Sequence, residues 1–255
     1  MPAQTGTLRV EHVMGMPIVV DVRDDVGEHA IDELFEWLRL VDAVFSTYKE
    51  ASDISRLNRG ELELHAAHPD VRDVLERSER LRVETYGYFD VHAASQVGVD
   101  PSGLVKGWSV ERASAILEGA GSSHFAISAG GDIVVRGGAL PASRWRIGVE
   151  HPRRRDAVAE VIELTDVAIA TSGTAARGDH VLDPHTGRPP EGLLSVTVVG
   201  PDLGTADAYA TAAFAMGTRG PHWTARLPRG YEAMSILGDE TVLFTAGFPR
   251  IAAAA

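Results

Sequence analysis

Two short stretches in the second half of the chain carry side chains that could do chemistry together. Residues 179–187 place His180 at the entry to a turn, and residues 206–211 place Asp207 and Thr211 four positions apart. An imidazole with a pKa near ~6.5 can accept a proton at neutral pH. A carboxylate and a hydroxyl are oxygen ligands of the kind that Mg²⁺ takes. We expect these stretches to serve phosphoryl chemistry rather than a packed core.

Ordinary structural roles could also explain these residues. Thr205 or Asp207 could cap a helix start by accepting a hydrogen bond from a free N–H group. His180 is one of ten histidines, so it could be a loop residue without a chemical task. If the segment is helical, however, Asp207 and Thr211 share one face, because they are one turn apart.

A third stretch, residues 100–108, joins a turn to a helix start and contains Asp100, Gly103 and Lys106. A glycine lets the backbone approach a ligand closely. A helix start offers N–H donors to a phosphate, and Lys106 would add positive charge there. A surface turn with a solvated lysine is the alternative interpretation.

Three further segments could contact a ligand. Gly130-Gly131-Asp132 lies between two predicted strands, where it could form a hairpin turn or a backbone cradle for an anion. It lacks the spacing of a dinucleotide-binding fingerprint. Thr171-Ser172-Gly173 lacks the G-x-S-x-G pattern, which argues against a hydrolase-type serine nucleophile. Tyr88-Phe89-Asp90 could stack on a planar ligand or fill the core.

The composition narrows the class of protein. The chain has 255 residues, is 44% hydrophobic and contains no cysteine. It can bury a substantial core, but it cannot form disulfides, thiolate nucleophiles, Cys-ligated zinc sites or iron–sulfur clusters. The formal net charge of −12 argues against a nucleic-acid-binding surface, which would be basic.

The first residues carry neither a basic region nor the apolar stretch of a signal peptide. No run approaches the ~20 apolar residues of a membrane span. We therefore expect a cytoplasmic protein without a transmembrane segment. The oligomeric state stays open.

Periodicity predicts an α+β fold in a single domain over residues 1–255. Apolar residues at helical spacing predict helices at 28–45, after Pro69, at 106–119 and at 205–217. Short β-branched runs bounded by Gly, Pro and Ser predict strands. These strands lie at 18–22, 125–128, 133–136, 145–149, 161–165, 167–170 and 194–199, with two more in 232–247, the last at 241–245.

The order of the motifs resembles that of the ApbE family, flavin transferases that move FMN from FAD onto a threonine or serine of a target protein. The resemblance runs from about residue 14 to about residue 247. In chain order the matching motifs are Met14-Gly15-Met16, Ser46-Thr47-Tyr48, Ser52 to Asn58, Gly87 to Asp90, Asp100 to Trp108, Gly130 to Asp132, Ala170 to Gly173, His180 to Gly187, and Asp207 to Thr211.

The resemblance implies a T-fold-related arrangement of mixed or antiparallel sheets with packed helices, and Mg²⁺-dependent transfer. Mg²⁺ would be held by the side chains of Asp207 and Thr211 and the backbone carbonyl of Gly103. His180 matches the histidine that takes the proton from the acceptor hydroxyl. FMN would stay on the acceptor protein through a phosphoester bond, and AMP would leave. FAD, as substrate, would contact Met14, Tyr48, Tyr88, Phe89, Asp90, Asp100, Lys106, Gly130, Gly131, Asp132, Thr171, Ser172, Gly173 and His180.

The chain departs from the family pattern in the short segment between Asp90 and Asp100, in His185 where a basic Arg or Lys is usual, and in Ser128-Ala129 where Asn is common. Two other functions fit the same residues. One is Mg²⁺-dependent hydrolysis of FAD to FMN and AMP, with water in place of the acceptor hydroxyl. The other is non-catalytic binding of FAD. The sequence does not identify the acceptor protein.

Overall fold

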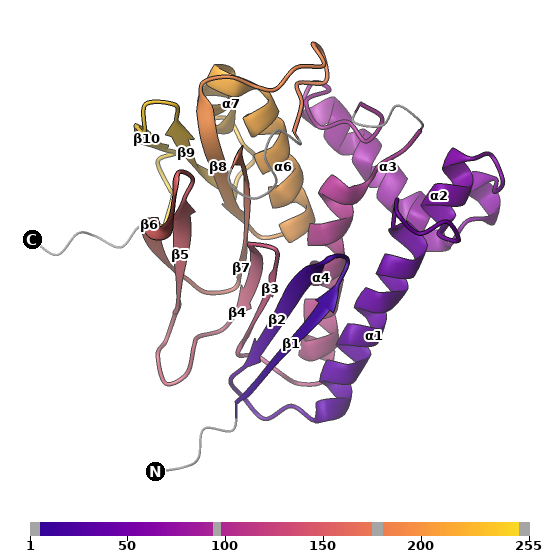
Figure 1. Cartoon of the computed structure of the whole chain (residues 1–255). Helices are drawn as coiled ribbons and strands as arrows, with labels where there is room; N and C mark the ends of the chain where they lie inside the picture. The colour runs from indigo at the N-terminus through magenta and orange to yellow at the C-terminus, as the bar shows by residue number, and fades with distance from the viewer. Residues whose placement is uncertain (1–5, 94–97, 175–180, 250–255) are drawn as a thin grey trace, which may run out of the picture.

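An eight-stranded sheet forms the centre of the structure (Figure 1), a computed structural model that describes residues 6–93, 98–174 and 181–249. Every pair of neighbouring strands in it is antiparallel. In spatial order the strands are β1 (Thr7–Val13), β2 (Met16–Val22), β3 (Phe125–Ala129), β4 (Asp132–Arg136), β7 (Val167–Gly173), β8 (Leu193–Gly200), β9 (Glu232–Leu237) and β10 (Val242–Phe244).

Helices cover one face of this sheet, and a separate hairpin lies toward the other (Figure 1). The hairpin consists of β5 (Trp145–His151) and β6 (Arg154–Leu164). The α-helices are α1 (Glu28–Phe45), α2 (Asp53–Asn58), α3 (Pro69–Glu84), α4 (Ser102–Gly119), α6 (Leu203–Ala215) and α7 (Gly220–Thr224). Two 3₁₀ turns, η1 (Leu64–Ala66) and η2 (Gly217–Arg219), complete the described elements.

Two apolar clusters pack on the two faces. The larger joins α1, α4 and α6 to the sheet, and α1 contributes buried residues from Ala30 to Phe45 at helical spacing. The smaller joins Trp145 and Ile162 of the hairpin to Ile169 of β7 and Met234 of β9. Because β8 lies between both clusters, all of its residues are buried. No helix in the described ranges is long and apolar enough to cross a membrane.

The predicted α+β class is confirmed, and most predicted elements are present. Helix α4 begins at Ser102 rather than at 106, so Gly103 lies in its first turn. Helix α6 spans 203–215 rather than 205–217, because Asp202 caps it by accepting from the Thr205 N–H at 2.7 Å. Strand β6 begins at Arg154, earlier than the predicted 161.

The α4–α6 crossing depends on glycine. A Cβ on Gly107 would lie 2.7 Å from the carbonyl oxygen of Leu203 and 2.9 Å from the backbone of Gly204. A side chain there would therefore force the two helices apart. Both helices carry residues of the predicted site, so this contact also sets the spacing of that site.

We expect Gly107→Ala to destabilise the protein by about 1–3 kcal/mol, the usual range for overpacking a tight contact. The matched control is Gly119→Ala at the other end of α4, where a Cβ meets nothing within 4 Å. That variant should be neutral or more stable by up to about 1 kcal/mol, because alanine is the better helix former. Urea unfolding measures both. Equal stability of the two variants would contradict the close-contact argument.

Candidate active site

Three charged side chains meet where α4, α6 and the β3–β4 turn come together. The Lys106 Nζ on α4 lies 2.6 Å from Asp132 Oδ2 and 3.6 Å from Asp207 Oδ2. Asp132 is only 1% exposed and Asp207 only 2% exposed. Two buried carboxylates thus share one ammonium group, which leaves the cluster with a formal surplus of negative charge when all three groups are ionised.

The hairpin interpretation of Gly130-Gly131 is confirmed, and the turn places Asp132. Both glycines have positive φ, 57° and 97°, which a two-residue turn of this kind requires. Asp132 is the first residue of β4 and pairs with Ala129. Its Oδ1 accepts a hydrogen bond from the Thr171 N–H at 3.2 Å. A short turn and a neighbouring strand therefore hold this carboxylate.

Asp207 does not cap α6, since Asp202 does. It lies in the second turn of the helix with its side chain buried. Apart from the ion pairs with Lys106, the Oδ2 atoms of Asp132 and Asp207 have no hydrogen-bond partner in the described part of the chain. Because Lys106 lies closer to Asp132 than to Asp207, the Asp207 carboxylate is the better suited of the two to receive a further positive group.

Burial is the main cause that raises the pKa of Asp207 to about 8, while the Lys106 ammonium opposes the shift and the Asp132 carboxylate adds to it. The main cause is the cost of moving the ionised carboxylate out of water. A cation that bound here would have to displace a proton at neutral pH.

Two hydroxyls extend the cluster along α6. Thr211 follows Asp207 by one turn, and its Oγ1 lies 3.1 Å from Ser172 Oγ. Side chains alternate between faces along a strand, so Thr171 points the other way and its Oγ1 lies 2.9 Å from Thr197 Oγ1. Thr171 thus reaches the cluster through its backbone. The absent side chain of Gly173 leaves room for the Leu194 carbonyl of β8.

Gly103 lies on the first turn of α4, against the ring of Phe89. A Cβ on Gly103 would be 3.2 Å from Phe89 Cε2. Phe89 is buried in the main core, which confirms the packing interpretation for this ring. Asp90 and Asp100 both order local turns, because Asp90 Oδ1 accepts from His92 N at 2.8 Å and Asp100 Oδ1 from Ser102 N at 3.0 Å.

Tyr88 joins two loops that are far apart in the sequence. Its ring packs edge-on against His185, with centroids 4.6 Å apart, and the Arg219 guanidinium lies 5.2 Å from its centroid. Arg219 also donates to the Tyr88 hydroxyl. His185 Nε2 donates to the Tyr86 carbonyl at 3.0 Å, so the turn that follows the predicted base is fixed to the aromatic segment.

The remaining predicted residues lie apart from this cluster or outside the described residues. Met14 lies in the β1–β2 turn with a φ of 55° and packs on the edge of the main core. Tyr48 is 95% exposed. His180, the predicted base, lies outside the described residues.

The described ranges hold no group of three or more His, Cys, Asp or Glu side chains that could bind a metal. A cation at Asp207 would therefore need hydroxyl, carbonyl or substrate oxygens as well. The sequence around Arg219 carries no signal of its contact with Tyr88, so this residue is not predicted from the sequence.

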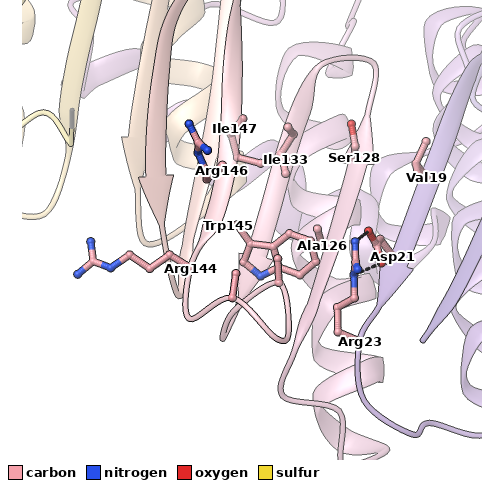
Figure 2. A pocket seen from close by; sticks show the side chains of 12 residues that line it. Val19, Asp21, Arg23, Ala126, Ser128, Ile133, Arg144, Trp145, Arg146 and Ile147 are labelled. Atoms are coloured by element: carbon pink, nitrogen blue, oxygen red, sulfur yellow. Dashed lines mark hydrogen bonds and ion pairs between the residues drawn. The ribbon is translucent and has the colours of Figure 1, made fainter. Parts of the chain in front are cut away.

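A separate hollow of about 450 Å³ opens on the opposite face of the sheet, between β2, β3 and the β5 strand (Figure 2). Its basic residues are Arg23, Arg144 and Arg146. Arg23 is paired with Asp21 at 2.6 Å, and Arg144 points away from the group (Figure 2). None of its lining residues belongs to the predicted site, so the Lys106 cluster is the better candidate.

A model of the ApbE family matches residues 14–97 and 92–235, which is most of the chain. The chain belongs to the ApbE family. Among curated ApbE relatives, the FAD:protein FMN transferase of Vibrio cholerae is 37% identical over 129 residues, which is 47% of this chain and 39% of that protein. The Haemophilus influenzae protein of the same name is 27% identical over 80% of this chain and 79% of that protein.

Solved structures agree on the fold. The flavin transferase ApbE of Vibrio cholerae superposes with a TM-score of 0.85 at 24% identity, over 95% of this chain and 98% of that one. The ApbE protein of Thermotoga maritima gives 0.86 at 23% identity with the same coverage. By sequence, the matches span well under half of the Vibrio and Salmonella relatives.

The raised pKa of Asp207 predicts how stability depends on pH. Between an ordinary pKa of 3.8 and about 8, the folded chain binds more protons than the unfolded chain. Metal-free protein should thus lose stability as pH rises through that window. Asp207→Asn should remove this loss, so its stability relative to wild type should increase from pH 5 to pH 8.

Chemical denaturation in the presence of a chelator measures the difference in free energy of unfolding between Asp207→Asn and wild type. Asp239→Asn is the matched control, because the exposed Asp239 has a lowered pKa and stays ionised in both states across that window. Its difference from wild type should stay constant. A constant difference for Asp207→Asn as well would contradict the assigned direction.

Proposed function

We propose that this chain transfers FMN from FAD to a threonine or serine hydroxyl of an acceptor protein and releases AMP. The observation that carries the proposal is the Lys106–Asp132–Asp207 cluster, in which two buried carboxylates face one ammonium group, beside the Thr211 and Ser172 hydroxyls. Membership of the ApbE family and relatives named FAD:protein FMN transferase support it.

The donor set fits Mg²⁺. Asp207 and Thr211 would hold it with the Gly103 carbonyl, as the family resemblance implies, and phosphate oxygens of FAD would complete the set. Carboxylate, hydroxyl and carbonyl oxygens are the ligands that hard cations prefer. When bound, Mg²⁺ would stabilise the negative charge that develops on the transferred phosphoryl group.

Lys106 is placed to serve the same charge. It faces Asp132 and Asp207 and lies in the second turn of α4. An ammonium that is held in place before the reaction stabilises charge that develops beside it. Asp132, held by the Gly130-Gly131 turn, would keep Lys106 in place while FAD binds.

The remaining family positions would hold FAD. Tyr88, braced by His185 and Arg219, offers a ring for a planar ligand. We assign the other contacts to Met14, Tyr48, Asp90, Asp100, Gly130, Gly131, Thr171, Ser172 and Gly173, whereas the buried Phe89 ring packs in the core.

His180 would take the proton from the acceptor hydroxyl. The acceptor oxygen then forms a bond to the phosphorus of the FMN portion, and the bond from that phosphorus to the bridging oxygen of AMP breaks. AMP leaves with the electron pair of that bond. Catalysis of this type rests mainly on positioning and charge stabilisation.

Hydrolysis of FAD uses the same groups, with water in place of the acceptor hydroxyl. The segment between Asp90 and Asp100 is short, so less of the chain is available there to exclude water. This feature favours hydrolysis as the second candidate function. Incubation with FAD and Mg²⁺, with and without an acceptor, separates the functions. Flavin mass on the acceptor supports transfer, AMP and free FMN without acceptor support hydrolysis, and bound FAD with no product supports a binding protein.

His180→Ala should lower the transfer rate by about 10²–10⁴-fold, the usual contribution of a general base. FAD affinity, measured by flavin fluorescence, should change little. His29→Ala, an exposed residue on α1, is the control and should transfer normally. Transfer by His180→Ala at near the wild-type rate would refute the assignment of the base.

Asp207→Ala should abolish transfer and the dependence of FAD binding on Mg²⁺. The physical reason is that Asp207 is the charged residue among the proposed Mg²⁺ ligands, so its removal should weaken metal binding most. Titration of Mg²⁺ against FAD fluorescence checks the second effect independently of activity. An unchanged Mg²⁺ titration would place the metal elsewhere.

A further inference from the structure

A buried tyrosine on α6 is hydrogen-bonded to the end of α3. Tyr209 lies between the proposed metal ligands Asp207 and Thr211 in the chain and is 3% exposed. Its hydroxyl donates to Glu84 Oε2 at 3.0 Å. Burial, together with this hydrogen bond, raises the pKa of Tyr209 above its ordinary value of 10.0, so the hydroxyl stays a donor at neutral pH. The bond therefore joins α6 to α3 under ordinary conditions.

The ring of Tyr209 is held separately by two other aromatic rings. Trp223 of α7 packs edge-on against it with centroids 5.6 Å apart, and Tyr231 does the same at 5.2 Å. Such pairs stabilise through the geometry of the rings and do not need the Tyr209 hydroxyl. Replacing Tyr209 with phenylalanine should thus remove the bond to Glu84 while the ring stays packed.

Glu84 is the last residue of α3, and the turn that follows it is fixed to the start of α4. Thr85 is fully buried, and its Oγ1 accepts a hydrogen bond from the Phe89 N–H at 3.0 Å. The Phe89 ring contacts the first turn of α4, where a Cβ on Gly103 would lie 3.2 Å from Phe89 Cε2. The bond between Tyr209 and Glu84 therefore connects α6 to the part of α4 that carries the Gly103 carbonyl.

The spacing of the proposed ligands depends on the angle between α4 and α6. The contact of Gly107 with Leu203 and Gly204 sets how closely the helices approach. Packed helices nevertheless vary in crossing angle by about 15–20°. Thr211 lies about two turns, or roughly 10 Å, beyond Gly204 along α6, so a rotation of about 10° would move it by roughly 2 Å. Mg²⁺ tolerates much less, because its oxygen ligands lie at about 2.0–2.1 Å.

We propose that Tyr209 and Glu84 are positioning residues that fix the angle of α6 against α4. They thereby set the distance from Asp207 and Thr211 to the Gly103 carbonyl. The inference rests on the proposed function, since it concerns the geometry of the metal site assigned there. It predicts that loss of the bond weakens Mg²⁺ binding more than Ca²⁺ binding. Mg²⁺ requires nearly octahedral geometry, whereas Ca²⁺ accepts longer and more variable distances.

Titration of the full chain and FAD with each cation, followed by flavin fluorescence, tests the proposal. For Tyr209→Phe we expect the half-saturating Mg²⁺ concentration to rise by up to about tenfold, the equivalent of one lost hydrogen bond, and that of Ca²⁺ to change by less than about twofold. Glu84→Ala should show the same pattern. Glu84→Gln should stay close to wild type, because its amide oxygen can still accept from the tyrosine hydroxyl.

The double variant Tyr209→Phe/Glu84→Ala should be no weaker than either single variant, because both changes remove the same bond. Tyr231→Phe is the matched control. Tyr231 packs on the same ring, but its hydroxyl is hydrogen-bonded to Thr205 of α6 rather than to α3. Urea unfolding should show similar losses of stability for Tyr231→Phe and Tyr209→Phe, whereas Tyr231→Phe should keep the wild-type Mg²⁺ titration.

The proposal is overturned if Tyr209→Phe titrates with Mg²⁺ like Tyr231→Phe. Equal weakening of Mg²⁺ and Ca²⁺ binding would also overturn it, since a general loss of structure affects both cations alike. If FAD binding by wild type does not respond to Mg²⁺, the metal site of the proposed function is refuted, and this inference with it.

Discussion

The ammonium group of Lys106 is the interaction on which the site depends. It lies between the buried carboxylates of Asp132 and Asp207, which come from a hairpin turn and from a helix. Two carboxylates buried together repel each other, and a single cation only partly offsets that repulsion. The raised pKa of Asp207 removes one of these charges at neutral pH when the site is empty, and a bound cation would favour the ionised form.

The rest of the fold fixes the distances within this cluster. Helices α4 and α6 approach closely because Gly107 and Gly204 have no side chains at their crossing. The sheet supplies the third group, since the two-residue turn leaves Asp132 little freedom. Three independent elements therefore meet at one point, and each is held by its own packing. Such support is what a site needs to keep its charges in place before substrate arrives.

The sequence predicts some of this well. The sequence predicts both ends of α1, because its apolar residues repeat at helical spacing from Ala30 to Phe45. The sequence does not predict β1, because the alternation of exposed and buried residues in this strand is unusual. Leu8 and Val10 are exposed, whereas Arg9 and Glu11 point toward α1, where Arg9 pairs with Asp32 and Glu11 with Arg39. A rule that places apolar residues inside cannot detect such a strand.

The candidate site, like the fold, is predictable from the sequence only in part. The spacing of Asp207 and Thr211 predicts a shared face, and both hydroxyl and carboxylate lie along one side of α6. The pairing of Lys106 with Asp132 has no local signal, because it depends on the register of β3, β4 and β7. The contacts of Tyr88 with His185 and Arg219 likewise join three segments that only the folded chain brings together.

The backbone hydrogen bond from Asp100 N–H to the Val91 carbonyl, 2.8 Å long, has a consequence for how this family can vary. This bond joins the two ends of the segment between Asp90 and Asp100, so residues can be added within the segment without moving its ends. The entropy of closing a loop grows slowly, by about 0.6 kcal/mol for each doubling of its length. The segment can therefore lengthen or shorten in evolution while Asp90 and Asp100 keep their places.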